Sequence, residues 1–536
     1  MSRPTPWLIP LVVALAGAIV LAWWLAGRPR EAGPDVAEGK LASVSFAPYR
    51  AGQSPFAGIF PTAAEVDADL ALLAGQVRGI RTYAAIEGDY DVAALAEKHG
   101  LKLWQGIWLG GDRAQNEREM ARAIADANRY PNTVERVVVG NEVLLRRDLP
   151  VAELIDDIEK IRAAVGQPVT YGEVWEFWEQ FPEVAEHVDM VTVHLLPYWE
   201  DVPTGVDGAI EHVLGVYRRM VARFPGKRIV IGETGWPSHG RWRADAAPGV
   251  VNQARFIREF LALARREGID ANLIEAFDQD WKYQSEGTVG ANWGLWTADR
   301  RPKFSFAGPV AEDRDWLREA VVGCVLGVLL LGVGLTVQGV RAGAQPRLAV
   351  LAMLAGGALG WASAATWADV YDGYSRVAAV GNLAGQGMLA VLLMRRVGFL
   401  LGGCAMPAAR TGADATEAVR ALLRGRLPRR AWLFDDLSFV FVWTAAVLQL
   451  LLLFDPRYRD FPVPTFVVPV LAICVRALLR DLPRGGGGRE ELWIGGVLVL
   501  AAIAGAVREG PLNRQSLVWA ACALVLAVPP LLRCRR

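Results

Sequence analysis

The chain has 536 residues, enough for two or three domains, and its 57 basic side chains balance its 57 acidic ones. A net charge of zero gives no electrostatic argument for a nucleic-acid partner. Hydrophobic residues make up 53% of the sequence and concentrate near the N-terminus and after Trp316. All five cysteines lie in that second apolar part, without a CxxC pair or a Cys/His cluster. We therefore expect no structural zinc site, and no disulfide in the region between.

The first predicted element is a membrane anchor. Residues 7–26 form an apolar run long enough to cross a hydrocarbon core of ~30 Å. A cleaved signal peptide is the alternative, but its apolar part would usually be shorter and no clear A-x-A site follows. We assign residues 1–30 to an uncleaved N-terminal anchor.

Residues 40–310 are predicted to form a (β/α)8 TIM barrel, an α/β fold. Short apolar runs alternate there with amphipathic stretches of helical spacing, which is typical of this fold. A doubly wound open sheet is the alternative, but it would more often have fewer strands. No G-x-G-x-x-G motif follows the first run, so dinucleotide binding has no support. The eight runs cover residues 42–47, 77–83, 102–109, 136–142, 169–174, 190–195, 228–233 and 272–277.

Residues 316–536 are predicted to form a helical membrane domain. The apolar segments 320–340, 348–368, 377–394, 431–454, 463–479, 492–507 and 517–532 are its seven candidate spans. With the N-terminus in the cytoplasm, most flanking arginines fall on the cytoplasmic side, including eight between Arg395 and Arg430. This arrangement predicts a multi-pass protein in a lipid bilayer whose barrel lies outside the cytoplasm. Asn382, Gln386, Asp435, Asp436 and Arg476 lie in or near spans, where they mark a transport pathway or simply snorkel.

Polar and aromatic residues gather at the ends of the predicted barrel strands. Active sites of such barrels lie at the C-terminal ends of the strands, so residues of this kind nearly all round the barrel predict a cleft there. The residues are Arg81, Tyr83, Trp104, Trp108, Asn141, Glu142, Tyr171, Glu173, Trp175, His194, Tyr198, Trp199, Glu233, Thr234, Trp236, Glu275, Asp278, Gln279, Trp281 and Lys282.

Two of these carboxylates directly follow apolar strands. Glu142 ends Val-Val-Val-Gly-Asn-Glu, and Glu233 ends Ile-Val-Ile-Gly-Glu. The fourth and seventh strands lie across the mouth of a closed eight-stranded barrel, so the two carboxylates can meet above it. Cleavage of a glycosidic bond needs two such groups, one to donate a proton and one to attack or stabilise the anomeric carbon. The alternative for either residue alone is a salt bridge with Arg81 or Arg136.

Other strand-end residues have both a functional and a structural interpretation. The Asn141 amide would hold a sugar hydroxyl or form a local turn. His194 and Tyr198 are predicted to hydrogen-bond Glu233, with core packing as the alternative for His194. The histidines do not cluster at ligand spacing and no nucleophile elbow is present, so neither metal nor serine hydrolysis is indicated. Aromatic faces suit pyranose rings, and the tryptophans that predict a carbohydrate cleft are Trp175, Trp178, Trp199, Trp236, Trp281, Trp293 and Trp296.

The motifs at residues 139–142 (Val-Gly-Asn-Glu) and 231–237 (Ile-Gly-Glu-Thr-Gly-Trp-Pro) resemble the two signatures of glycoside hydrolase family 17. That family comprises retaining β-1,3-glucanases and glucanosyltransferases on (β/α)8 barrels. Residues 275–282 and 286–295 are similar to its bacterial branch, and the resemblance covers about residues 42–306.

This resemblance implies that Glu142 is the general acid/base and Glu233 the nucleophile, without a cofactor or a metal. Plant members carry a glutamate where this chain has Gln279, which puts a second acidic helper in doubt. The expected substrate-binding residues are Arg81, Tyr83, Asn141, Trp175, Trp178, His194, Tyr198, Trp199, Trp236, Asp278, Gln279, Lys282 and Trp293.

The eight-span layout resembles bacterial membrane proteins called β-(1,6)-glucan synthases, which act in cyclic β-glucan assembly. This resemblance implies a transglycosylase of the bacterial inner membrane, with its catalytic domain in the periplasm and a glucan-synthesising glycosyltransferase as a partner. Such an enzyme cleaves a β-1,3-glucan and passes it to a glucan acceptor, with the 6-hydroxyl as one candidate position. The alternatives are a hydrolytic β-1,3-glucanase and a non-catalytic glucan-binding or export subunit.

Overall fold

The computed structural model describes residues 5–36, 40–404, 423–425, 433–482 and 489–532. The chain divides into two compact units, one formed by Pro29–Ala311 and the other by Met1–Arg28 with Glu312–Arg536. Much of the predicted cytoplasmic loop between Arg395 and Arg430 lies outside the described residues.

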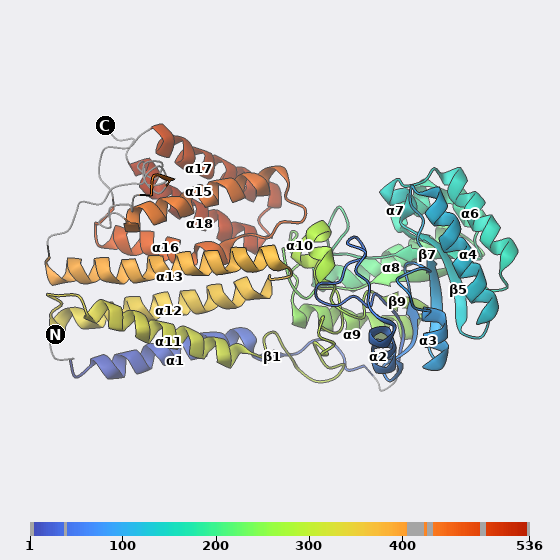
Figure 1. Cartoon of the computed structure of the whole chain (residues 1–536), viewed down its shortest axis with the longest axis horizontal. Coiled ribbons are helices and arrows are strands. Elements are labelled where there is room, and N and C mark those ends of the chain that lie inside the picture. Colours follow the sequence, from blue (N-terminus) through green and yellow to red (C-terminus); the bar gives the residue numbers. More distant parts are fainter. Residues whose placement is uncertain (1–4, 37–39, 405–422, 426–432, 483–488, 533–536) are drawn as a thin grey trace. The chain divides into compact units, whose positions relative to one another are not determined.

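The unit Pro29–Ala311 is a closed barrel of eight parallel strands (Figure 1). The barrel closes where Val44 of the first strand pairs with Leu273 of the last. The predicted TIM barrel is therefore confirmed, and the open sheet is excluded. The strands are β2 (Leu41–Ser45), β3 (Val77–Arg81), β4 (Lys102–Ile107), β5 (Val134–Asn141), β6 (Val169–Val174), β7 (Met190–His194), β8 (Arg228–Thr234) and β9 (Ala271–Leu273).

Helices connect successive barrel strands and bury their apolar faces against them. Helix α2 begins at a capping box in which the Thr62 and Glu65 side chains satisfy each other's backbone N–H groups. The helices are α2 (Ala63–Ala74), α3 (Val92–Lys98), α4 (Arg113–Arg129), α5 (Val143–Arg146), α6 (Val151–Ala164), α7 (Trp175–Gln180), η1 (Pro182–Glu186), α8 (Val206–Arg223), α9 (Val250–Glu267), η2 (Asp280–Lys282) and α10 (Tyr283–Ala291). A short antiparallel pair, β1 (Pro29–Arg30) and β10 (Val310–Ala311), joins the two ends of this unit.

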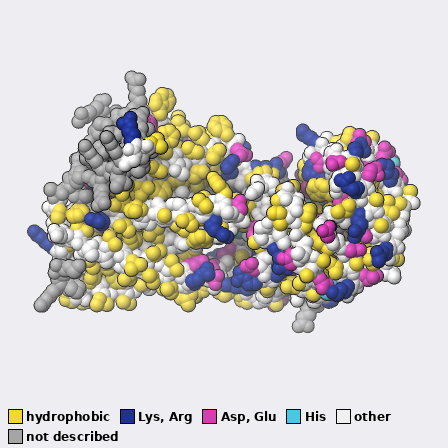
Figure 2. Space-filling model, viewed as in Figure 1, with side chains coloured by type: hydrophobic (Ala, Val, Ile, Leu, Met, Phe, Trp, Pro, Cys, Tyr) yellow, Lys and Arg dark blue, Asp and Glu magenta, His cyan; other side chains and the backbone are white. Residues whose placement is uncertain are grey.

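The other unit is built from apolar helices, one at each of the eight predicted spans. Among the described residues, seven helical segments are long and apolar enough to cross a membrane, and α16 is a shorter apolar helix. Figure 2 shows how densely hydrophobic side chains cover the visible face of this unit. The helices are α1 (Leu8–Gly27), α11 (Trp316–Leu335), η3 (Ala342–Ala344), α12 (Gln345–Ala368), α13 (Gly373–Gly402), α15 (Leu433–Phe454), α16 (Val463–Leu478), α17 (Arg489–Glu509) and α18 (Arg514–Leu531).

Several polar residues of these helices are bound to one another. Arg476 Nη1 lies 2.9 Å from Asp435 Oδ1. Asp481 accepts from Arg396 Nη2 at 2.7 Å and contacts Arg476 Nε at 3.4 Å. Gln386 donates to Asn382 Oδ1 and to the carbonyl of Pro464. These contacts hold α13, α15 and α16 together, which favours packing over the transport pathway that the sequence also allowed.

Candidate active site

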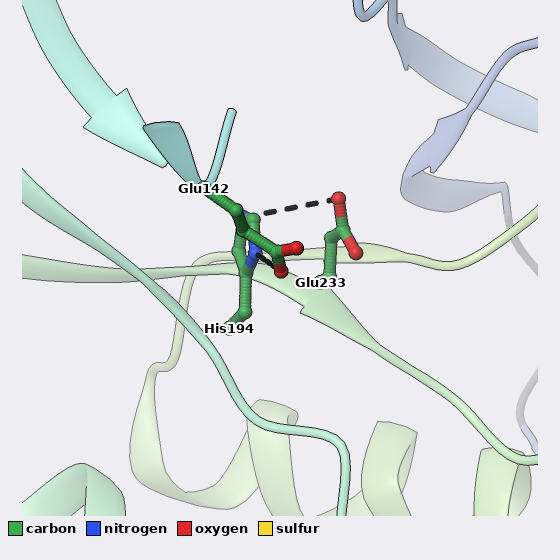
Figure 3. Close-up of side chains that lie close together, drawn as sticks. All are labelled: Glu142, His194 and Glu233. Carbon is green, nitrogen blue, oxygen red and sulfur yellow. Dashed lines mark hydrogen bonds and ion pairs between the residues drawn. The ribbon is translucent and has the colours of Figure 1, made fainter. Parts of the chain in front are cut away.

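Glu142 follows β5 in a turn that requires an unusual backbone. Gly140 has φ +85°, and a Cβ there would lie 2.7 Å from Val143 Cγ2, so this position favours glycine. Glu142 itself lies in the left-handed region, with φ 52° and ψ 35°. Its N–H donates to the carbonyl of Gly172 on β6 at 2.8 Å. The turn brings the Glu142 side chain close to His194 and Glu233 (Figure 3).

Glu233 lies in β8 with only 4% of its surface exposed, and Arg81 of β3 holds it. Arg81 Nη1 donates to Glu233 Oε1 at 2.8 Å and to the carbonyl of Gly232 at 2.9 Å. Arg81 Nη2 donates to Asn141 Oδ1 at 2.6 Å. One guanidinium therefore joins Glu233 in β8 to Asn141, the last residue of β5 and the neighbour of Glu142.

Glycine makes room for these side chains. A Cβ on Gly172 would lie 2.9 Å from Arg81 Nη2 and 3.0 Å from His194 Nε2. A Cβ on Gly232 would lie 3.0 Å from His194 Cδ2. Gly172 of β6 and Gly232 of β8 thus allow the arginine and the histidine to lie directly against the strands.

His194 lies between the two carboxylates, but it bonds a different one from the one predicted. Its Nδ1 is 2.7 Å from Glu142 Oε1, whereas its Nε2 is 3.8 Å from Glu233 Oε1 (Figure 3). The predicted hydrogen bond to Glu233 is therefore replaced by one to Glu142. The Tyr198 hydroxyl, also expected at Glu233, donates to the carbonyl of Arg241 at 2.6 Å.

Glu142, His194 and Glu233 each place one ligand atom within 4.8 Å of the others. The sequence placed His194 near Glu233 but indicated no metal site here. The spacing would suit a metal ion, but Arg81 already supplies a positive charge 2.8 Å from Glu233 Oε1. The same spacing brings an oxygen of each predicted catalytic carboxylate within 4.8 Å of the other.

Several positive charges favour the ionised form of Glu233. Burial alone would raise the pKa of its carboxyl, but His194, Arg81 and Lys282, with a hydrogen bond from Tyr83, lower that pKa below its ordinary value. The Arg81 guanidinium also lies 5.1 Å from the centre of the Tyr83 ring. Arg81, Tyr83 and Lys282, predicted as substrate contacts, therefore also act on the electrostatics of Glu233.

Three further acidic residues surround this pair, and none of them has a defined role in the sequence-based prediction. Glu275 is buried and accepts two hydrogen bonds from Lys282 Nζ, at 2.9 and 3.0 Å. Burial raises the pKa of Glu275 to about 7 although Lys282 opposes the shift. Burial and the charge of Glu142 raise the pKa of Glu173 to about 7. Burial also raises the pKa of Glu286, with Lys282 opposing and Glu142 and Glu233 adding to the shift.

Two predicted substrate contacts have internal partners in the barrel unit. Gln279 donates to the carbonyls of Ala47 and Phe277 and accepts from Trp281 Nε1. Asp278 accepts from Lys303 Nζ at 2.5 Å and from the N–H of Gly294 at 3.0 Å. Both side chains are buried, and these bonds favour a role in stabilising the loop after β9.

Some of the aromatic residues predicted to bind sugar rings are fully buried, and others are partly exposed. Trp178, Trp236, Trp293 and Tyr198 are each at most 1% exposed, which leaves no ring face for a sugar. Trp178 Nε1 donates to the carbonyl of Thr192, and Trp236 Nε1 donates to the carbonyl of Ala247. Packing, the alternative interpretation, therefore applies to these four rings.

Trp175 and Trp199 remain partly exposed. The Arg219 guanidinium lies 4.8 Å from the centre of the Trp175 ring. Trp199 stacks on Trp293, with ring centres 6.2 Å apart. Arg136, the alternative salt-bridge partner for the two glutamates, instead contacts Asp270 at 2.9 Å and Glu135 at 3.0 Å.

The barrel is similar to known glucan-active proteins. Residues 43–294 match the BtgE/BtgC glycoside hydrolase domain. A glucan 1,3-beta-glucosidase of Schizosaccharomyces pombe is 30% identical over 255 residues, covering 44% of this chain and 79% of that protein. One from Arthroderma benhamiae is 28% identical over 278 residues, covering 47% and 87%.

A solved structure is also similar. An active-site mutant of Rhizomucor miehei beta-1,3-glucanosyltransferase in complex with laminaritriose is 24% identical, covers 51% of this chain and 98% of its own, and has a TM-score of 0.43. The Schizosaccharomyces pombe relative, of which the chain covers 79%, shows that this chain belongs to the family 17 glycoside hydrolases, whose domain it carries in residues 43–294.

Proposed function

We propose that the chain is a membrane-bound, retaining transglycosylase that cleaves β-1,3-glucan through a covalent intermediate on Glu233 and transfers the glycosyl unit to a glucan acceptor. The proximity of the Glu142 and Glu233 carboxylates, with oxygens within 4.8 Å of one another, carries the proposal. Retaining glycosidases hold their carboxyl groups ~5–5.5 Å apart, whereas inverting enzymes leave ~6.5–9.5 Å for a water molecule.

Glu233 attacks in the first step. One of its carboxylate oxygens forms a bond to the anomeric carbon while the bond from that carbon to the glycosidic oxygen breaks. Glu142 gives its proton to the departing oxygen, which leaves as a free hydroxyl on the remaining glucan. The lowered pKa of Glu233 supports its role as the attacking carboxylate, because the group stays ionised at neutral and mildly acidic pH.

Glu142 acts as a base in the second step. It accepts the proton of an incoming hydroxyl, whose oxygen bonds the anomeric carbon as the ester to Glu233 breaks. Two inversions restore the β configuration. His194 bonds Glu142 Oε1 at 2.7 Å and therefore orients the carboxylate that moves the proton in both steps.

Transfer and hydrolysis differ only in the acceptor. Water competes at ~55 M, but positioning can give a bound sugar hydroxyl an effective molarity of ~10⁵ M. Trp175 follows β6, the strand beside the one that leads to Glu142, and its partly exposed ring is our candidate for the acceptor side. A glucan 6-hydroxyl as acceptor would give the β-1,6 linkages that the resemblance implies.

The location of the barrel completes the proposal. In the chain, the apolar helix α1 precedes the barrel and the apolar helix α11 follows it, and the flanking arginines favour a barrel outside the cytoplasm. We propose the bacterial inner membrane as the site, with the barrel in the periplasm. A glucan-synthesising glycosyltransferase would then supply the donor.

Hydrolysis is the second candidate, because the relatives from Schizosaccharomyces pombe and Arthroderma benhamiae are named glucan 1,3-beta-glucosidases. Product analysis of the purified full-length protein on linear β-1,3-oligosaccharides separates the two. Products longer than the substrate, with linkages assigned by methylation analysis, support transfer. Shorter products alone, even at high glucan concentration, would establish the hydrolytic function, and no products at all would support a non-catalytic binding subunit.

A further inference from the structure

Two buried residues of β6, Tyr171 and Glu173, lie beneath the turn that carries Glu142. Both side chains are at most 1% exposed, so neither is available to a glucan. Neither acts in the two chemical steps described above. Their polar atoms are nevertheless directed at one short stretch of backbone, the beginning of α5.

The contacts form one connected network. The Tyr171 hydroxyl donates to Glu173 Oε2 and accepts from the N–H of Leu144 at 3.0 Å. Glu173 Oε2 also accepts from the N–H of Leu145 at 3.2 Å, and Glu173 Oε1 accepts from the N–H of Val174 at 2.9 Å. Two consecutive N–H groups directly after Glu142 and Val143 are therefore held by side chains of the neighbouring strand.

These bonds replace an ordinary helix cap. The first N–H groups of a helix have no partner within it and are usually satisfied by the N-cap side chain. Glu142 is the N-cap residue of α5, but its side chain makes no cap bond. Its carboxylate instead extends to His194, at 2.7 Å. Tyr171 and Glu173 thus supply the capping acceptors and leave the Glu142 carboxylate available for proton transfer.

The backbone of Glu142 needs this support. A residue other than glycine in the left-handed region is strained by ~1–3 kcal/mol and persists only where its surroundings fix it. Glu142 has φ 52° and ψ 35° there. Its own N–H is fixed by Gly172 on one side, and the N–H groups of Leu144 and Leu145 are fixed by the network on the other.

We propose that Tyr171 and Glu173 are positioning residues that hold the strained turn and so aim Glu142 at the departing glycosidic oxygen. This inference rests on the proposed acid/base role of Glu142. It predicts that the loss of rate depends on the donor, because misplacing the acid slows only those reactions in which the leaving group needs a proton. A displacement of ~1 Å can reduce the rate of such a step ~10²-fold.

The test compares Tyr171→Phe and Glu173→Gln with the wild type, as full-length protein in detergent, on two donors. One is a linear β-1,3-oligosaccharide, and the other is an aryl β-glycoside whose leaving group needs no proton. For both donors, kcat/KM reports formation of the glycosyl intermediate. We expect kcat/KM to fall ~10- to 100-fold on the oligosaccharide and less than ~3-fold on the aryl donor.

Tyr130→Phe is the matched control, because it removes a tyrosine hydroxyl that donates to a carboxylate away from the site, that of Asp91 at the N-cap of α3. It should leave the ratio of the two activities unchanged. Equal losses on both donors in Tyr171→Phe and Glu173→Gln, or no loss on the oligosaccharide, would overturn the inference.

Glu142→Gln separates this inference from the proposed function. If Glu142→Gln retains the aryl donor and loses the oligosaccharide while Tyr171→Phe and Glu173→Gln behave as wild type, only the positioning role fails. If Glu142→Gln retains full activity on both donors, the acid/base assignment fails.

Discussion

Replacement of Arg81 tests how the site sets the charge of Glu233. Three hydrogen bonds from one planar guanidinium reach Glu233, Asn141 and the carbonyl of Gly232, at 2.6 to 2.9 Å. Lysine keeps the charge but lacks the fork that spans these acceptors. Methionine removes both the charge and the fork. The two variants therefore separate geometry from electrostatics.

The expected magnitudes follow from the contacts. A hydrogen bond to a charged group contributes ~1.5–3 kcal/mol, so loss of the fork in Arg81→Lys should lower kcat/KM on an aryl β-glycoside by about 10²-fold. Arg81→Met leaves a buried carboxylate without its closest cation, which costs ~3–5 kcal/mol and predicts a loss of about 10³-fold. Because Arg81 lowers the pKa of Glu233, its removal raises that pKa.

The assay is the pH dependence of kcat/KM on the aryl donor, with the full-length protein. The acidic limb should move to higher pH in Arg81→Met and stay close to its wild-type position in Arg81→Lys, because the ionised nucleophile is the reactive form. Arg136→Met is the control, since Arg136 is also buried but pairs with Asp270 and Glu135. An acidic limb that does not move in Arg81→Met would refute this account of Glu233.

Three other predictions concern stability, acceptor choice and topology. Burial, with the charge of Glu119, raises the pKa of Glu87 from 4.5 to about 8, so its contribution to stability is present at low pH and is lost as pH rises to about 8. Glu87→Gln stays neutral and should raise Tm by ~3 °C or more at pH 8.5 while changing it little at pH 5; equal shifts at both pH values would contradict this. Trp175→Ala should raise the ratio of hydrolysis to transfer products at low acceptor concentration, as measured by mass spectrometry; slower donor cleavage at an unchanged ratio would assign Trp175 to the donor side or to packing. A reporter fused between residues 405 and 422 should be cytoplasmic and one fused after Asp455 external; the same side for both would exclude the eight-span topology.

The barrel could be predicted because each of its strands is recognisable from a short stretch of sequence. Apolar runs and intervening amphipathic stretches depend on local composition, and the structure places strands at all eight runs. The residues at which the strands end were less predictable. The run predicted at 272–277 continues past β9, which ends at Leu273, and residues beyond it bond the barrel individually, as the N–H of Ala276 does with the carbonyl of Ser45.

Within the site, the positions of residues were more predictable than their partners. Glu142 and Glu233 could be found because both follow apolar strands. His194 hydrogen-bonds Glu142 and not Glu233, and this partner depends on the directions of side chains from three different strands. A local sequence pattern does not contain that information. A tryptophan shortly after a strand has the same sequence signal whether its ring faces solvent, as Trp175 of α7 partly does, or the core, as Trp178 of α7 does.

The support for Glu142 was hidden for a related reason. Tyr171 and Glu173 could be recognised as polar residues in an apolar strand, but their partners are backbone N–H groups of the next turn. Only the left-handed backbone of Glu142 brings those groups within reach.

The covalent intermediate tests the central claim most directly. We would incubate the full-length Glu142→Gln variant with a 2-fluoro aryl β-glycoside, in which the activated leaving group needs no proton and the fluorine slows breakdown of the ester. Peptide mass spectrometry should then find one glycosyl group per chain, attached to Glu233. The absence of an adduct while the aryl group is still released, or an adduct on any other residue, would contradict the assignment of Glu233 as the nucleophile.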